Sequence, residues 1–131
     1  MRLCTALALF LLAAPAAAAQ ARWKSIGSTP AGNPVYVDTR TVKKSGHLVS
    51  ADIRVVFTTP VKAGKVTWAS SRTSATVDCA RRSMAARENV YYSDARGTKV
   101  AERRVNKQPG FGSVIGGSLG DVALKHLCAA K

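Results

Sequence analysis

The sequence predicts an α+β fold: a single antiparallel sheet of about five to six strands, with a C-terminal helix packed on one face and one disulfide bond. Three observations predict it. Apolar and polar residues alternate from Val49 to Phe57, which is the period of a half-buried strand. After Ser118, apolar residues recur at helical three- and four-residue steps. Cys79 and Cys128 form an even pair of thiols.

The first residues have the pattern of an export signal. Arg2 supplies a positive charge, Leu3–Ala14 form an apolar run, and small residues follow, so that cleavage after Ala19 or Ala21 fits equally well. The rival interpretation is a membrane-spanning helix, but the apolar run is shorter than the roughly 20 residues that a bilayer requires. We therefore expect a signal peptide, and no transmembrane segment after its cleavage.

The length and charge of the chain bound its organisation and its partners. A chain of 131 residues has room for one domain, which we place at residues 22–131, after a signal peptide of residues 1–19. The formal net charge is +13, and removal of the signal takes away only Arg2, which leaves +12. Such an excess favours nucleic acid, anionic lipid headgroups, acidic glycans or outer-leaflet phosphates as partners, although it also serves solubility alone.

The cysteines indicate a structural disulfide. Cys4 lies inside the expected signal, so Cys79 and Cys128 remain as an even pair, and such a pair usually bonds in an oxidising compartment. The bond would close a loop of about 50 residues and stabilise the fold by roughly 4 kcal/mol in the entropic model. Redox motifs instead place two cysteines close together in sequence.

The first half of the chain reads as strands separated by turns. Arg22–Ser28 alternates, Val35–Asp38 is a short β-favouring run, and Val49–Phe57 has the clearest period of two. We expect Pro60 and then Ala63-Gly64 to break the chain after this third strand.

The second half continues the sheet. Val66–Cys79 is rich in residues that suit a long strand. Arg81–Tyr92 is ambiguous, because its first half allows a helix by propensity while its last three residues favour a strand. Asp94–Gly97 predicts a hairpin turn, and Lys99–Val105 an exposed edge strand, in a sheet that is antiparallel throughout.

A helix closes the chain. Five glycines lie between Pro109 and Gly120, after which Ser118 is a suitable N-cap, with the carboxylate of Asp121 at the positive end of the helix. The apolar positions that should cover one face of the sheet are Leu119, Val122, Ala123 and Leu127.

Several residues with a shared order and spacing extend from Trp23 to Cys128: Trp23, Ile26-Gly27, Tyr36-Val37-Asp38, Val42, Gly46, Val77–Arg82, Tyr91-Tyr92-Ser93, Gly97, Gly117-Ser118 and Leu127-Cys128. In these residues the chain resembles the surface-adhesin protein E-like family of small exported bacterial proteins. The resemblance implies an antiparallel sheet backed by a C-terminal helix, with the helix cysteine bonded to the one that ends the central long strand. It also implies adhesion to host proteins and a homodimer. Where the family usually has a tryptophan before a turn, this chain has Phe111 and a glycine-rich stretch.

No pattern of catalysis or cofactor binding stands out. The two imidazoles, His47 and His126, are too few for a zinc site, and the serine-hydrolase, dinucleotide and phosphate-loop patterns do not match. Asp38, Asp52 or His126 could serve an unfamiliar enzyme site, but nothing in the sequence fixes their geometry. We expect no enzyme activity, no cofactor and no metal.

Basic residues near two tyrosines are the candidate site for an anion or other ligand. The candidates are Arg81, Arg82, Arg87, Tyr91, Tyr92, Arg103, Arg104 and Lys107, which a predicted hairpin would bring into one basic patch. The alternative is a solvated edge whose charges discourage unwanted strand pairing.

Two functions follow from these observations. The first is a non-catalytic exported module for binding or adhesion, in the bacterial periplasm, at the cell surface or secreted, that contacts acidic polymers or host matrix proteins. The alternative is extracytoplasmic binding of nucleic acid or lipopolysaccharide through the basic patch, with Tyr91 or Tyr92 stacking on bases, although no recognised nucleic-acid motif is present.

Overall fold

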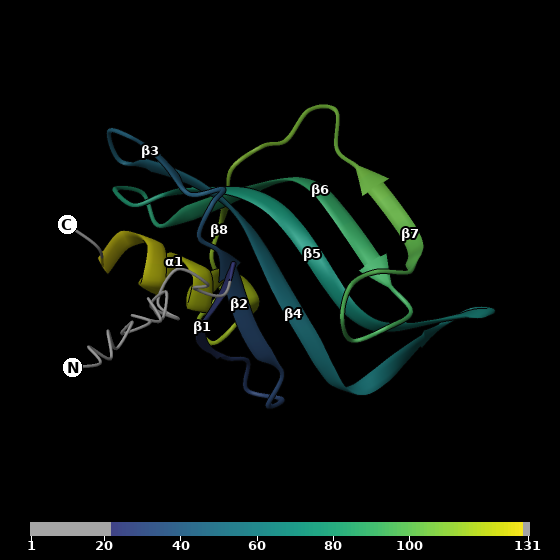
Figure 1. Ribbon diagram of the computed structural model, residues 1–131. Helices are drawn as coiled ribbons and strands as arrows, with labels where there is room; N and C mark the ends of the chain where they lie inside the picture. The colour runs from purple at the N-terminus through teal and green to yellow at the C-terminus, as the bar shows by residue number, and fades with distance from the viewer. Residues whose placement is uncertain (1–21, 130–131) are drawn as a thin grey trace, which may run out of the picture.

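Eight strands and one helix make up residues 22–129, which is the part of the chain that the computed structural model describes (Figure 1). The expected signal peptide, residues 1–19, lies outside the described residues. In chain order the elements are β1 (Trp23–Ser28), β2 (Pro34–Asp38), β3 (Lys43–Ser45), β4 (Leu48–Ala63), β5 (Val66–Asp78), β6 (Ser83–Tyr92), β7 (Val100–Val105), β8 (Gly112–Ser113) and α1 (Leu119–Ala129).

All strands belong to one antiparallel sheet. Its order is β1-β2-β4-β5-β6-β7, with β3 paired to β4 and β8 paired to β6. The predicted kind of fold is confirmed, but the predicted number of five to six strands is wrong, because the sheet has eight. The two that a period-two pattern cannot reveal are β3, with three residues, and β8, with two.

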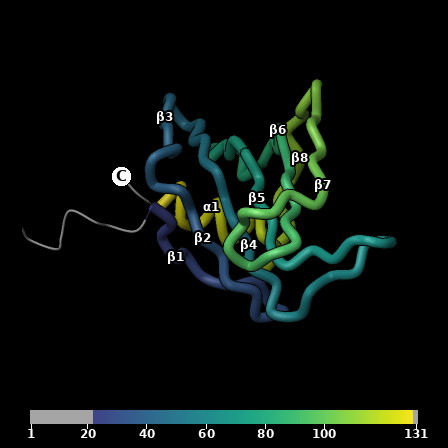
Figure 2. Tube along the Cα trace, turned by 45° about the vertical axis from the view of Figure 1, so that its right-hand side comes forward, coloured from purple at the N-terminus to yellow at the C-terminus, as the bar shows by residue number. Residues whose placement is uncertain are grey.

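A long hairpin of β4 and β5 forms the centre of the sheet, and its tip projects from the body of the molecule (Figures 1 and 2). The prediction that Pro60 ends the strand is wrong, because β4 continues to Ala63. The pairing register shifts between Val56 and Val61, and such an irregularity tolerates a proline that has no N–H to donate. The chain reverses at Gly64, whose φ of 64° is in the left-handed region.

The ambiguous segment before Tyr92 is a strand. β6 pairs with β5 along one side and with β7 and β8 along the other, so its backbone groups find partners that an isolated helix would not need. Sheet pairing therefore overrides the helix propensity of its first half. One residue, Arg87, is a bulge, since Ser74 pairs with Glu88 and Ala75 with Ala86.

The core lies between the sheet and α1, which covers one face near β1, β2 and β4 (Figure 1). Buried apolar side chains of β2, β4 and β5 pack against three buried residues of the helix, Ala123, Leu124 and Leu127. Burial of each large apolar side chain stabilises the fold by roughly 1.5–3 kcal/mol. Within residues 22–129, no helix has both the length and the apolar content needed to cross a bilayer.

Both predicted attachments of the helix are confirmed. At its start, the Ser118 Oγ accepts a hydrogen bond of 3.3 Å from the backbone N–H of Asp121, as an N-cap does. At its end, Cys128 is bonded to Cys79, with the two Cα atoms 5.5 Å apart. The helix is therefore held to the sheet by its apolar face and by a covalent link.

Candidate anion-binding surface

The face of the sheet opposite α1, which we call the open face, carries the polar side chains of the central strands. Directly paired residues of antiparallel strands point to the same side of a sheet. The apolar residues Val49 and Ala51 point to the helix, so the residues between them point away from it. Three cross-strand rows therefore line the open face: Ser50, Thr76 and Ala85; Asp52, Ser74 and Glu88; Arg54, Arg72 and Val90.

The eight predicted site residues do not gather in one patch. Arg81 and Arg82 lie in the turn between β5 and β6, and the guanidinium of Arg82 is 3.9 Å from the carboxylate of Asp121 at the start of α1. Arg103 pairs with Val90 on the open face, whereas Arg104 pairs with Asn89 on the other side. Successive residues of a strand point to opposite faces, so these two arginines serve different surfaces.

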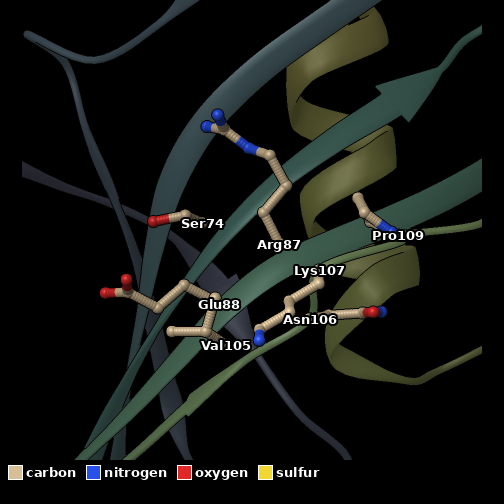
Figure 3. Close-up of a pocket in the computed structure, with 7 residues that line it drawn as sticks. All are labelled: Ser74, Arg87, Glu88, Val105, Asn106, Lys107 and Pro109. Atoms are coloured by element: carbon tan, nitrogen blue, oxygen red, sulfur yellow. The ribbon is translucent and has the colours of Figure 1, made fainter.

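Arg87 and Lys107 do lie together, at the rim of a hollow of about 350 Å³ on the open face. Figure 3 shows them on neighbouring segments, with α1 on the far side of the strands. The bulge at Arg87 leaves its carbonyl to accept a hydrogen bond of 2.8 Å from the N–H of Asn106, and this bond holds the segment of Lys107 against β6.

A second hollow, of about 290 Å³, shares Arg87 with the first and adds Arg40 and Lys43. We call Arg40, Lys43, Arg87 and Lys107 together the basic end of the open face. No ion pair among the described residues engages any of these four side chains. Arg40 and Lys43 were not predicted as site residues, because their place beside Arg87 depends on how β3 pairs with β4.

The two carboxylates of this face, Asp52 and Glu88, are already matched by partners. Asp52 accepts a hydrogen bond of 2.6 Å from Ser74 and lies 3.5 Å from Arg72. Glu88 lies 2.9 Å from Arg72 and 3.3 Å from Arg103. Arg72 and Arg103 therefore balance the acidic groups, and the four cations of the basic end remain uncompensated.

Tyr91 and Tyr92 also serve different surfaces. The ring of Tyr91 is stacked on that of Trp68, with centroids 3.9 Å apart, and the guanidinium of Arg104 lies 5.4 Å from the Tyr91 centroid. Glu102 hydrogen-bonds Arg104 at 2.8 Å and raises its pKa. Tyr92 instead lines a pocket at the other end of the open face. Trp68 was missed as a partner of Tyr91, because only the curvature of the sheet brings the two rings together.

Within residues 22–129, no group of three or more His, Cys, Asp or Glu side chains is placed to hold a metal ion. The pKa of His126 is lowered, first by burial and then by the nearby charge of Lys24. The pKa of Asp121 is also lowered, because the carboxylate accepts a hydrogen bond from the N–H of Gly117 and pairs with Lys125. Both shifts arise where α1 meets the sheet and its N-terminal turn.

Solved structures of Haemophilus influenzae protein E share this fold. Its crystal form II is 15% identical, with a TM-score of 0.60 over 84% of this chain and 89% of that chain. The selenomethionine form is 16% identical, with a TM-score of 0.58 over 85% and 88%. No curated protein sequence matches the chain.

The family model of surface-adhesin protein E matches residues 23–129, which is nearly the whole described chain. The resemblance inferred from the sequence is thereby confirmed, and with it the adhesion-type character of a surface protein. The chain belongs to the surface-adhesin protein E family.

Proposed function

We propose that this protein is a non-catalytic exported adhesion module that binds an acidic polymer, such as an acidic glycan of the host matrix, through the open face of its sheet. The observation that carries the proposal is the basic end of that face, where Arg40, Lys43, Arg87 and Lys107 line two adjoining hollows without a carboxylate partner among the described residues. Uncompensated cations in a hollow concentrate the field and attract anions.

Export of the domain, residues 22–131, is part of the proposal. It requires that residues 1–19 act as a signal peptide, with cleavage after Ala19 or Ala21. The destination is the bacterial cell surface or the periplasm, and the homodimer that the resemblance implies belongs to the same proposal. Host matrix proteins that carry acidic polymers are the expected partners.

The test compares two variants with the same loss of charge. Arg87→Ala combined with Lys107→Ala removes two cations of the basic end, whereas Lys62→Ala combined with Lys65→Ala removes two cations from the tip of the β4–β5 hairpin. Binding of the purified protein to heparin, a sulfated glycan, should weaken about tenfold in the first variant, because each cation near an anionic surface contributes up to about 1 kcal/mol. The second variant should bind almost as the parent does.

Salt gives an independent check of the same proposal. Exposed charges are screened within about 10 Å at 0.1 M salt, so heparin binding should weaken as salt is added. Equal losses in the two variants would show that net charge alone matters, and would contradict a site at the basic end. Absence of heparin binding by the parent protein would contradict the proposal as a whole.

Nucleic acid and lipopolysaccharide are the alternative partners. Tyr91 is stacked on Trp68, and Tyr92 lies elsewhere on the sheet, so the two tyrosines offer no shared platform for successive bases. Retention of Arg103→Ala and Arg104→Ala variants on single-stranded DNA, on lipopolysaccharide and on matrix proteins separates these partners. A loss confined to DNA or to lipopolysaccharide would favour the alternative.

A further inference from the structure

A second pocket of the open face lies at the end away from the basic end, under the turn between β6 and β7. We call it the turn pocket. It has a volume of about 280 Å³, near the lower limit of ligand pockets. Besides Gly97, its lining consists of four arginines and two aromatic residues: Arg22, Trp23, Arg54, Arg72, Tyr92 and Arg96.

The charges of the turn pocket do not cancel. Arg22 pairs with the buried carboxylate of Asp38 at 2.7 Å, and Arg72 is matched by the carboxylates described above. Arg54 and Arg96 have no carboxylate partner within residues 22–129. The pocket therefore has two positive charges that no acidic side chain of the described chain offsets.

The positions of Arg54 and Arg72 are unfavourable for the fold by themselves. The two residues lie directly opposite each other on β4 and β5, and like charges in that relation destabilise a sheet. The Nε groups of both are buried without an acceptor in the described part of the chain, and each such donor costs about 1–3 kcal/mol. Local costs that gather at one pocket are typical of binding sites.

Neighbouring groups hold these guanidiniums in place. The Cζ atoms of Arg22 and Arg54 lie 5.6 and 5.9 Å from the centroid of the Trp23 ring, which is cation–π distance. Arg54 also donates a hydrogen bond to the carbonyl of Ala95 in the turn. Gly97 has a φ of 73°, and a Cβ there would lie 3.7 Å from the Arg54 guanidinium, so the turn packs closely over it.

We infer that the turn pocket binds one sulfate or carboxylate group on a sugar unit of an acidic glycan. The planar donors of a guanidinium match the oxygens of such groups in pairs. A bound oxyanion would offset the charges of Arg54 and Arg96. Guanidiniums lie over the Trp23 ring, so it is not free to stack on a base, and this favours a glycan over a nucleic acid.

This inference rests on the proposed function and adds a defined subsite to it. The probe is a sulfated disaccharide derived from heparin, and binding is measured by calorimetry with the purified protein. Arg96→Ala is the main variant, because Arg96 is exposed in a turn and its loss should leave the fold intact. Arg54→Lys is the second variant, since it keeps the charge and removes the paired donors.

We expect each of these variants to bind the disaccharide about fivefold more weakly, which corresponds to ~1 kcal/mol. The Arg87→Ala, Lys107→Ala double variant is the control, and its disaccharide affinity should stay within about twofold of the parent. Inorganic sulfate should bind more weakly than the disaccharide, because it lacks the sugar. Equal binding of the two would overturn the assignment to a glycan, in favour of a free oxyanion.

Unchanged disaccharide binding in both Arg96→Ala and Arg54→Lys would overturn the subsite. That result would leave the proposed function standing if heparin binding still depended on Arg87 and Lys107. Conversely, heparin binding that is insensitive to Arg87 and Lys107, together with disaccharide binding that depends on Arg96, would contradict the basic end and support the turn pocket. Single-stranded DNA that competes better than the disaccharide for the turn pocket would also overturn the assignment.

Discussion

Asp94 shows how one side chain can shape the turn that covers a pocket. Its carboxylate accepts hydrogen bonds from the N–H groups of Thr98, at 3.0 Å, and Lys99, at 2.9 Å, and from the hydroxyl of Thr98. The Thr98 hydroxyl contributes most to lowering the pKa of Asp94 from 3.8 to about 2, followed by the Lys99 N–H. The turn was predicted from Asp94–Gly97, but its role in enclosing Arg54 could not be, because that contact joins distant strands.

The lowered pKa of Asp94 sets a window for the order of the turn. A carboxyl group whose pKa is lowered in the folded protein stabilises it above the unfolded value, here 3.8, and this contribution is lost as pH falls through about 2. The amide signals of Thr98 and Lys99 should therefore titrate with a midpoint near 2 in NMR spectra. A midpoint close to 4 would show that the hydrogen bonds do not form in solution. Asp94→Asn should remove this titration.

Leu124 tests the core at the same scale. It is 1% exposed and packs against buried residues of β2 and β4. Leu124→Ala should lower the free energy of unfolding by about 2–5 kcal/mol, because it removes buried apolar contacts and leaves a cavity. Urea unfolding measures this loss. A change below about 1 kcal/mol would mean that the helix is packed more loosely against the sheet than described.

At the scale of elements, sequence patterns predicted the strands with a clear period and missed those that depend on their neighbours. The alternation from Val49 to Phe57 is reproduced in the burial of β4. β3 and β8 have too few residues for any period, and Pro60 is accommodated where the pairing register shifts. The patch expected along β6 and β7 divides between two faces, because period two separates Arg103 from Arg104.

The cap of α1 can be tested on its own. Ser118→Ala should lower the free energy of unfolding by about 1 kcal/mol, because the Asp121 N–H loses its acceptor. Ser118→Asp keeps an acceptor at the N-cap and should retain the stability of the parent. Thermal unfolding of the three proteins compares them. Equal stability of Ser118→Ala and the parent would mean that water serves the helix end as well as Ser118 does.

At the scale of the whole molecule, the covalent link between sheet and helix was predictable, whereas the binding surface was not. An even pair of cysteines after an export signal needs no coordinates to suggest a bond. The two pockets of the open face need the curvature of the sheet, the bulge at Arg87 and the β6–β7 turn, and none of these has a signal in the sequence that fixes its direction.

Loss of the disulfide should weaken the domain as a whole. Replacing both Cys79 and Cys128 with serine should cost about 2–5 kcal/mol in the free energy of unfolding, because the unfolded chain regains the freedom of a closed loop. Denaturant unfolding with and without a reductant gives the same comparison in the parent protein. Identical stability in the two conditions would contradict a structural role for the bond.

The most direct test of the account is an NMR titration of the purified protein with heparin, read at each backbone amide. Adhesion through the open face predicts that the largest shifts fall around Arg87 and Lys107 and in the β6–β7 turn around Arg96. Shifts confined to the outer surface of α1 or to the tip of the β4–β5 hairpin would contradict it, since those basic residues lie away from the open face.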